Sequence, residues 1–204
     1  MAAKRCINLK KFHVTVFGGT NNKEFTAAEE ACSKKLGKYL GEVGAEVLTG
    51  ACRGFPLFVG REAIKHGAKV IGYSPAMDEK EHVEKYGFPL DGVTDMEYIK
   101  KDGKHQADNF LTRSWEMTPY SDVVIALGGS WGTYTELLFS FWYKKTIILV
   151  EGFGGAVEAF GNTHKFFGSR CYNPGVHYGA TLISVKTVDE AVAEIEKIRC
   201  ASGK

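Results

Sequence analysis

One segment, Asp122-Val-Val-Ile-Ala-Leu-Gly-Gly-Ser-Trp-Gly-Thr-Tyr-Thr-Glu136, carries the clearest structural signal in the chain. It opens with a short apolar run, which is typical of a buried strand. Gly128 and Gly129 then allow the backbone to turn tightly, and a helical pattern follows. A strand that leads through a glycine turn into a helix is the first half of a βαβ unit.

The same order of elements repeats on both sides of this segment. Alternating apolar runs and helical patterns are typical of a parallel sheet that is buried on both faces. We therefore expect one α/β domain with a parallel sheet of about six or seven strands and helices on both faces. The expected strands span residues 12–17, 45–49, 69–73, 122–127, 146–150 and 181–185. The expected helices span residues 24–42, 55–66, 105–118, 132–143 and 188–199.

The domain is expected to occupy residues 12–199, between an N-terminal extension, residues 1–11, and a C-terminal tail, residues 200–204. Two segments interrupt the alternation. Residues 74–104 mix charges with glycine and proline, and residues 152–179 are rich in glycine and aromatic residues. Each is expected to be a loop over a binding site or irregular surface, because long connections in compact domains are usually functional or disordered.

The composition is that of a soluble globular protein of 204 residues with a formal net charge of +2. The 26 Lys+Arg against 24 Asp+Glu give no excess for a broad phosphate-neutralising surface, so nucleic acid is not an expected partner. Five scattered cysteines indicate reduced thiols, and no segment approaches the ~20 apolar residues of a membrane span. Residues 1–11 lack the apolar region of a signal peptide. We expect a cytoplasmic protein without membrane contact.

Glycine-rich turns follow three of the expected strands. Glycine lets backbone N–H groups approach an oxyanion, and the following helix N-terminus adds donors and partial positive charge. These turns therefore predict a phosphorylated ligand, although glycines also serve ordinary turns with positive φ. The candidate phosphate-binding residues are Gly18, Gly19, Thr20, Gly50, Gly54, Gly128, Gly129, Ser130, Gly132 and Thr133.

Several specific motifs are absent from the sequence. It contains no G-x-x-x-x-G-K-[ST], which excludes the nucleoside triphosphate machinery of a P-loop, and no G-x-G-x-x-G after the first strand, which disfavours dinucleotide redox chemistry. No H-E-x-x-H or Cys/His cluster indicates a metal. We therefore expect neither a metal nor a cofactor.

Arg113 precedes the fourth expected strand and Glu136 follows it, so the two should meet near the end of that strand. A carboxylate can stabilise an oxocarbenium ion or deprotonate water when an N-glycosidic bond to ribose breaks, and a guanidinium suits a phosphate or carboxylate. Two other interpretations stay open. Thr133-x-x-Glu136 matches a helix capping box, and Arg113 could pair with Glu116 or Asp122 on a solvated face.

A serine hydrolase is a further alternative, since Gly128-Gly-Ser130-Trp-Gly132 satisfies G-x-S-x-G between a strand and a helix. Ser130 would then be the nucleophile. The acid and base would come from Glu151 or Glu158 with His164 or His177. The sequence has no HGGG-type oxyanion segment, which counts against this interpretation.

Two motifs resemble a known family. Arg113-x-x-x-Met117, followed by Gly128-Gly-Ser-Trp-Gly-Thr-x-x-Glu136, is similar to the R-K-x-x-M and P-G-G-x-G-T-x-x-E motifs of the Lonely Guy family of cytokinin-activating phosphoribohydrolases. The spacing from arginine to glutamate matches without a gap. Upstream, residues 49–54 and 70–72 are similar to the family's glycine-rich turn and V-I-G strand. The resemblance covers residues 12–150.

This resemblance implies a Rossmann-like homodimer, or a larger oligomer, that hydrolyses nucleoside 5′-monophosphates to free base and ribose 5-phosphate. It also implies catalytic roles for Arg113 and Glu136 and a phosphate site at the glycine turn. Relatives are often labelled lysine decarboxylase-like, but no lysine here indicates pyridoxal-phosphate chemistry.

The sequence departs from the family motifs at several positions. Ser114 stands where the family has lysine, Gly128 replaces a proline and Ser130 replaces a glycine. These changes bear on substrate and activity rather than on fold. Carriers of the same fold, among them molybdenum-cofactor carriers, therefore provide the alternative: a protein that binds a nucleotide or molybdenum cofactor without turning it over.

Overall fold

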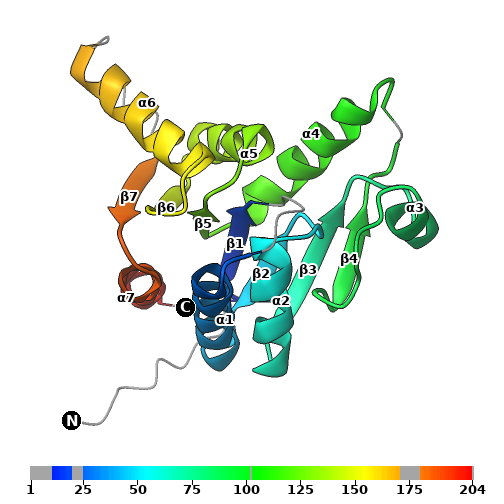
Figure 1. The fold of residues 1–204 in the computed structure, drawn as a ribbon, viewed down its shortest axis with the longest axis horizontal. Helices are drawn as coiled ribbons and strands as arrows, with labels where there is room; N and C mark the ends of the chain where they lie inside the picture. Colours follow the sequence, from blue (N-terminus) through cyan, green and yellow to red (C-terminus); the bar gives the residue numbers. More distant parts are fainter. Residues whose placement is uncertain (1–10, 20–24, 102, 171–179, 204) are drawn as a thin grey trace.

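The computed structural model describes residues 11–19, 25–101, 103–170 and 180–203, and for residues 166–170 only the backbone. One parallel sheet of seven strands forms the centre of the molecule, in the order β4-β3-β2-β1-β5-β6-β7 (Figure 1). The expected α/β architecture is therefore confirmed. The strands are β1 His13–Gly18, β2 Glu46–Thr49, β3 Lys69–Ser74, β4 Asp95–Tyr98, β5 Val123–Leu127, β6 Thr146–Val150 and β7 Thr181–Val185.

Helices cover both faces of the sheet (Figure 1). The helices α1, α2 and α7 contribute to one buried apolar cluster, and α4, α5 and α6 contribute to the other. The short helix α3 lies beside the edge formed by β4. The helices are α1 Ala27–Glu42, α2 Phe55–Lys65, α3 Glu79–Glu84, α4 Gln106–Met117, α5 Trp131–Trp142, α6 Ala156–Arg170 and α7 Val188–Ala201, with a 3-10 turn at Thr118–Tyr120.

The central strand β5 shows how the sequence fixes the two layers. Every residue of β5 is fully buried, and its side chains alternate between the two sides of the sheet. Val123, Ile125 and Leu127 pack toward α1, α2 and α7. Val124 and Ala126 pack toward α4, α5 and α6. A continuous apolar run is thus required on this strand, because both of its faces need covering.

The direction of the chain across the sheet reverses beside β1. The chain runs outward from β1 through β2 and β3 to β4, and then returns to build β5, β6 and β7 on the other side. Because the carboxyl ends of β1 and β5 adjoin at this switch point, the helices that follow them diverge and leave a crevice. The glycine turns after β1, β2 and β5 therefore lie next to one another.

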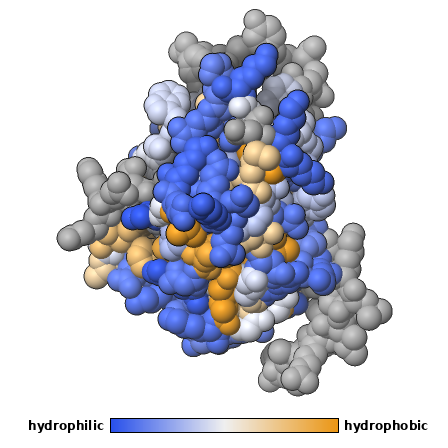
Figure 2. Space-filling model, turned by 90° about the vertical axis from the view of Figure 1, so that its right-hand side faces the viewer, coloured by the Kyte–Doolittle hydropathy of each residue, from blue (hydrophilic) through white to orange (hydrophobic). Residues whose placement is uncertain are grey.

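The two segments expected to be irregular contain regular elements. Residues 74–104 hold α3 and β4, and residues 152–179 hold α6, so the expectation that these segments lack helices and strands was wrong. The strand β4 escaped detection because it is an edge strand, and its exposed Asp95 and Glu97 interrupt any apolar run. Figure 2 looks onto the side of α3 and β4, where hydrophilic atoms surround a strip of hydrophobic ones. Residues 171–179 lie outside the described residues.

Candidate active site

A cavity of about 160 Å³ lies in the crevice at the carboxyl ends of β1, β2 and β5. It brings together residues from α2, α4 and α5 with the glycine turns. Its volume is below the roughly 300–1,000 Å³ of sites for drug-sized ligands, so it encloses part of such a ligand. The lining residues are Val16, Phe17, Gly18, Gly50, Cys52, Pro56, Phe88, Phe110, Arg113, Ser130, Gly132, Thr133 and Glu136.

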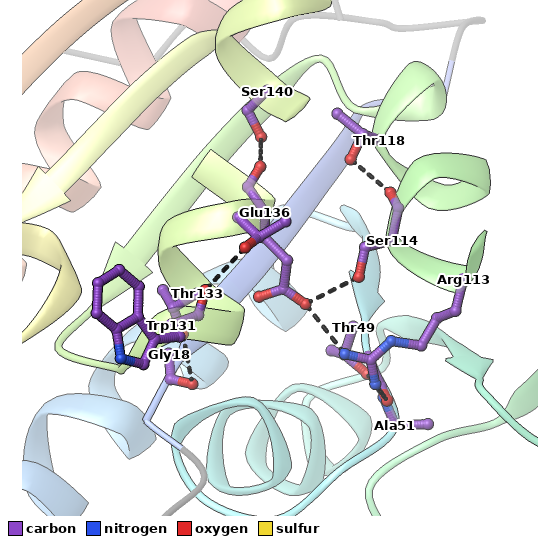
Figure 3. A network of polar contacts seen from close by, with 12 residues as sticks. Gly18, Thr49, Ala51, Arg113, Ser114, Thr118, Trp131, Thr133, Glu136 and Ser140 are labelled. Carbon is purple, nitrogen blue, oxygen red and sulfur yellow. Dashed lines mark hydrogen bonds and ion pairs between the residues drawn. The ribbon is translucent and has the colours of Figure 1, made fainter. Parts of the chain in front are cut away.

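The two predicted catalytic residues meet in this cavity as a buried ion pair (Figure 3). Arg113 on α4 and Glu136 on α5 are each only 7% exposed. Nη2 of Arg113 donates a hydrogen bond of 3.1 Å to Oε1 of Glu136, and Oγ of Ser114 donates one of 3.2 Å to the same oxygen. Arg113 therefore does not pair with Glu116 or Asp122 on a solvated face, and that alternative was wrong.

Gly50 completes the seat of the guanidinium. Its carbonyl oxygen, just after β2, accepts a hydrogen bond of 2.6 Å from Nη1 of Arg113. A Cβ at position 50 would lie 2.7 Å from this nitrogen and 2.8 Å from the guanidinium carbon. A glycine is thus needed here because the arginine side chain approaches closely.

The buried position of Glu136 changes its acidity. Burial raises its pKa above the usual carboxyl value, because the charged form loses hydration, while the charge of Arg113 and the hydrogen bond from Ser114 oppose this rise. Among the described residues, no group bonds to Oε2, which points away from Arg113 in Figure 3. Glu136 can therefore exchange a proton with a molecule in the cavity. Burial also raises the pKa of the Cys52 thiol in the same cavity, so this thiol is not an activated nucleophile.

The helix α5 starts earlier than its sequence suggests. It begins at Trp131, with Ser130 as an N-cap of extended backbone whose side chain makes no capping hydrogen bond. The hydroxyl of Thr133 donates to the carbonyl of Gly18 at 3.2 Å instead of capping the helix. Glu136 lies one turn inside the helix and faces Arg113. The capping-box interpretation was therefore wrong, and the first turn of α5 faces the cavity without a side-chain cap.

The turn before α5 is built by glycines that support the site from behind. Gly128 and Gly129 have φ of 60° and 95°, a region that L side chains rarely adopt. A Cβ on Gly129 would lie 2.3 Å from Oγ1 of Thr133. Its carbonyl accepts a hydrogen bond of 2.9 Å from the amide of Ala156. Gly128 and Gly129 therefore fix the turn and are not among the residues that line the cavity.

Of the remaining residues predicted to bind phosphate, some line the cavity and others stabilise the turns around it. Gly18, Ser130, Gly132 and Thr133 line the cavity together with Gly50. A Cβ on Gly132 would meet no atom within 4 Å, so this position opens onto space.

Two other predicted glycines support the start of α2. Gly19 accepts a hydrogen bond of 3.1 Å from the amide of Phe55, and Gly54, with φ of 85°, precedes that residue as the N-cap. Neither glycine lines the cavity. Thr20 lies outside the described residues.

The geometry does not assemble a serine hydrolase. Ser130 is exposed at the start of α5, and among the described residues no imidazole lies within hydrogen-bond distance of its hydroxyl. His164 on α6 instead contacts the ring of Phe141, with 6.2 Å between centroids. His177 lies outside the described residues.

The sequence analysis did not identify several residues of the site. Ser114, beside the cavity lining, donates to Glu136, although it stands where the Lonely Guy motif has lysine. Phe110 could have been found, because it lies three residues before Arg113 and therefore on the same side of α4. Phe88 belongs to a segment without periodicity and carries no such signal. In the described part of the chain, no three metal-ligating side chains cluster, and no helix is long and apolar enough to cross a membrane.

Solved structures of proteins with different descriptions share this fold. TM1055, a structural genomics target, gives a TM-score of 0.71 at 23% identity, covering 91% of this chain and 99% of its own. The molybdenum cofactor carrier protein from Chlamydomonas reinhardtii gives 0.63 at 22% identity, covering 93% and 99%. DNA processing protein A from Helicobacter pylori, which binds single-stranded DNA, gives 0.63 at 15% identity, covering 91% and 80%. Identities this low show a shared fold alone.

The family follows from the sequence itself. No curated protein matches the chain significantly. The profile of the SLOG cluster4 family, in contrast, matches residues 11–171, which is most of the chain. This assignment is coarser than the resemblance to Lonely Guy enzymes, which stays a prediction. The chain belongs to the SLOG cluster4 family.

Proposed function

We propose that the protein hydrolyses the N-glycosidic bond of a nucleoside 5′-monophosphate, giving free base and ribose 5-phosphate. The observation that carries this proposal is the buried carboxyl of Glu136, which has a raised pKa and one unengaged oxygen beside a helix N-terminus without a side-chain cap. A helix N-terminus binds phosphate through its amides and dipole. The match of Arg113 and Glu136 to the Lonely Guy motifs supports the same reaction.

Glu136 has the central chemical role in this proposal. It accepts a proton from water as the water oxygen bonds to C1′ of the ribose. The C1′–N bond breaks and its electron pair stays on the base nitrogen. The proton that Glu136 received from water balances the one that this nitrogen takes up as the base leaves, so Glu136 returns to its carboxylate form. A carboxylate near C1′ also stabilises the positive charge that develops on the sugar.

Arg113 has a different role from the one expected of it. Two of its nitrogens are engaged by Gly50 and Glu136. In the proposed reaction it orients Glu136 and offsets its charge, while phosphate binding belongs to the start of α5. Its Nε is buried without a partner among the described residues.

Base release measured by chromatography tests the proposal. Adenosine, guanosine, cytidine and uridine monophosphates are incubated with the wild type and with Glu136→Gln, which retains an oxygen for the bonds from Ser114 and Arg113. We expect release from at least one nucleotide and a loss of ~100-fold or more in the variant, the usual effect of removing an acid–base group. No release from any of the four would contradict it.

The second candidate is a carrier that binds a nucleotide or molybdenum cofactor without turnover. The fold shared with the molybdenum cofactor carrier protein and the replacement of the motif lysine by Ser114 favour it. Tight binding of a phosphorylated ligand without base release would select this function. In both cases we propose a phosphorylated small molecule as ligand rather than nucleic acid, because the net charge is only +2.

We also propose that the protein is a homo-oligomer assembled through the outer face of α5. Glu136 is the one charged residue of α5, and it is buried. The outer face of the helix leaves Trp131 84%, Leu138 39% and Trp142 57% exposed. A helix without charge on its outer side is normally covered. A second copy is the simplest cover, since a symmetric dimer joins the same patch on both subunits.

A further inference from the structure

The cavity has two chemically different ends. Gly132 and Thr133, at the start of α5, form a polar end beside β5. Phe88, between α3 and β4, and Phe110, on α4, form an aromatic end. The helix α4 packs against β3, and β3 and β4 lie on the opposite side of β1 from β5. The two phenylalanines, here called the aromatic wall, therefore lie across the crevice from the start of α5.

The aromatic wall is held rigidly from behind. The ring of Tyr86 lies 5.8 Å from that of Phe88 and 5.6 Å from that of Phe110. The fully buried His82 contacts Phe88 at 5.6 Å and shares a hydrogen bond of 2.8 Å with Ser74. These contacts fix the two rings before any ligand binds, and so reduce the entropy that binding must overcome.

The aromatic wall also lies next to Arg113 and Glu136. Nη2 of Arg53, in the turn that follows β2, donates a hydrogen bond of 2.7 Å to the carbonyl of Gly87 and so ties Phe88 to this turn. The guanidinium carbon of Arg113 lies 5.3 Å from the ring centre of Phe110. The order across the cavity is therefore the helix N-terminus, the carboxyl of Glu136 and then the aromatic wall.

This order matches the order of groups in a nucleotide: phosphate, ribose and base. Because Phe88 is nearly parallel to Tyr86 and Phe110 is nearly perpendicular to it, the two rings of the wall meet at a steep angle. We propose that the base stacks on Phe88 with Phe110 against its edge, while the phosphate lies at the start of α5, which places the glycosidic bond at Glu136. The inference rests on the proposed nucleotide ligand. The two phenylalanines of the aromatic wall offer no hydrogen-bonding side chains, so the base is recognised by its face rather than by hydrogen bonds to its edges. Purine nucleotides, with the larger stacking surface, should therefore bind more tightly than pyrimidine nucleotides.

Calorimetry with AMP and with ribose 5-phosphate separates the base from the rest of the ligand. Both are titrated into proteins that carry Glu136→Gln, so that the nucleotide is not consumed. We expect Phe88→Leu to weaken AMP binding about tenfold or more, the usual effect of losing one stacking ring, and to change ribose 5-phosphate binding by less than about twofold. Phe88→Tyr, which keeps the ring, should retain AMP binding. Phe58→Leu is the matched control, because Phe58 packs on Phe25 at 5.2 Å outside the cavity lining.

Three results would overturn the inference. They are unchanged affinity for AMP in Phe88→Leu, an equal loss of affinity for AMP and ribose 5-phosphate in that variant, and tighter binding of CMP than of AMP by the protein in which Phe88 and Phe110 are unchanged. Phe110→Leu provides a second variant if Phe88→Leu does not fold, as judged by circular dichroism. Hydrolysis is measured separately with wild-type protein. If base release is absent but the difference between AMP and ribose 5-phosphate is found, the base site stands and the hydrolase proposal fails.

Discussion

The two oxygens of the Glu136 carboxylate differ in their surroundings. One accepts hydrogen bonds from Arg113 and Ser114, and the other has no partner among the described residues. The sequence could predict that Arg113 and Glu136 meet, because α4 precedes β5 and α5 follows it. It could not predict the donor Ser114, nor that Thr133 bonds to the carbonyl of Gly18 instead of capping the helix. Both contacts join segments that are far apart in the sequence.

The raised pKa of Glu136 predicts how activity depends on pH. The deprotonated carboxylate is the form that accepts a proton from water, so base release should increase with pH through the pKa of Glu136 and then level off. Because burial raises that pKa, the increase should lie above ~4.3, the ordinary value for glutamate. Initial rates across a pH series provide the measurement. An increase centred at or below the ordinary value would contradict Glu136 as the base.

Gly50 offers a test of how Arg113 is positioned. A Cβ at position 50 would lie 2.7 Å from Nη1, so Gly50→Ala should displace the guanidinium and reduce turnover at least about tenfold. Gly161→Ala is the matched control, since its Cβ would make an ordinary contact of 3.6 Å with Leu149 inside α6. Steady-state rates and melting temperatures of both variants provide the comparison. Full activity in Gly50→Ala would show that turnover does not depend on the position at which Gly50 holds the Arg113 guanidinium.

Among the elements, those with both faces buried were the easiest to predict. The strands β5 and β6 follow their apolar runs, with starts and ends within one residue of expectation. The helix α3 has six residues, too few for a helical period, and β4 alternates charged with half-buried residues at the edge of the sheet. The helix α6 was not predicted because it contains glycines at positions 161 and 168, and glycine is unfavourable inside a helix. The site was predicted where it depends on strand ends and missed where it depends on these short elements, as with Phe88.

The N-terminus of α5 can be tested by filling the space in front of it. Gly132 lines the cavity, and a side chain there would meet no protein atom within 4 Å. Gly132→Val should therefore fold normally but block the approach of a phosphate, weakening nucleotide binding at least tenfold, about 1.4 kcal/mol. Thr135→Val on the same helix, outside the cavity lining, is the control. Unchanged affinity in a folded Gly132→Val protein, measured by calorimetry, would remove the phosphate site from this turn.

At the scale of the whole molecule, the notable surface feature is aromatic rather than charged. The net charge is only +2, whereas α4 and α5 together expose the side chains of Trp115 and Trp142. Trp115 on α4 is 51% exposed and contacts Phe139 and Tyr143 at 5.5 Å and 4.8 Å. Together with Trp142 it exposes on the order of 200 Å² of aromatic surface. The largest apolar patch of a monomeric protein, a few hundred Å², is often a functional surface.

This face predicts how the assembly responds to a single charge. Trp142→Glu would place two carboxylates near each other across a symmetric interface, so the oligomer should dissociate to monomers. Val83→Glu is the control, because Val83 is 43% exposed on α3, away from this face. Light scattering after size exclusion gives the masses. A wild-type protein that is already monomeric at micromolar concentration would contradict the proposed interface.

The incorporation of oxygen from water into ribose 5-phosphate tests the proposed hydrolysis most directly. The wild type and Glu136→Gln are incubated with AMP in water enriched in oxygen-18, and the mass of the sugar phosphate is determined by mass spectrometry. Unlabelled ribose 5-phosphate in the same water gives the rate at which its C1 oxygen exchanges with water, and this exchange is subtracted. The predicted result is free adenine together with ribose 5-phosphate that carries one heavy oxygen, formed ~100-fold or more slowly by the variant. Intact nucleotide after prolonged incubation of AMP, and of each of the other three monophosphates, with a protein that binds one of them would contradict hydrolysis and identify a carrier.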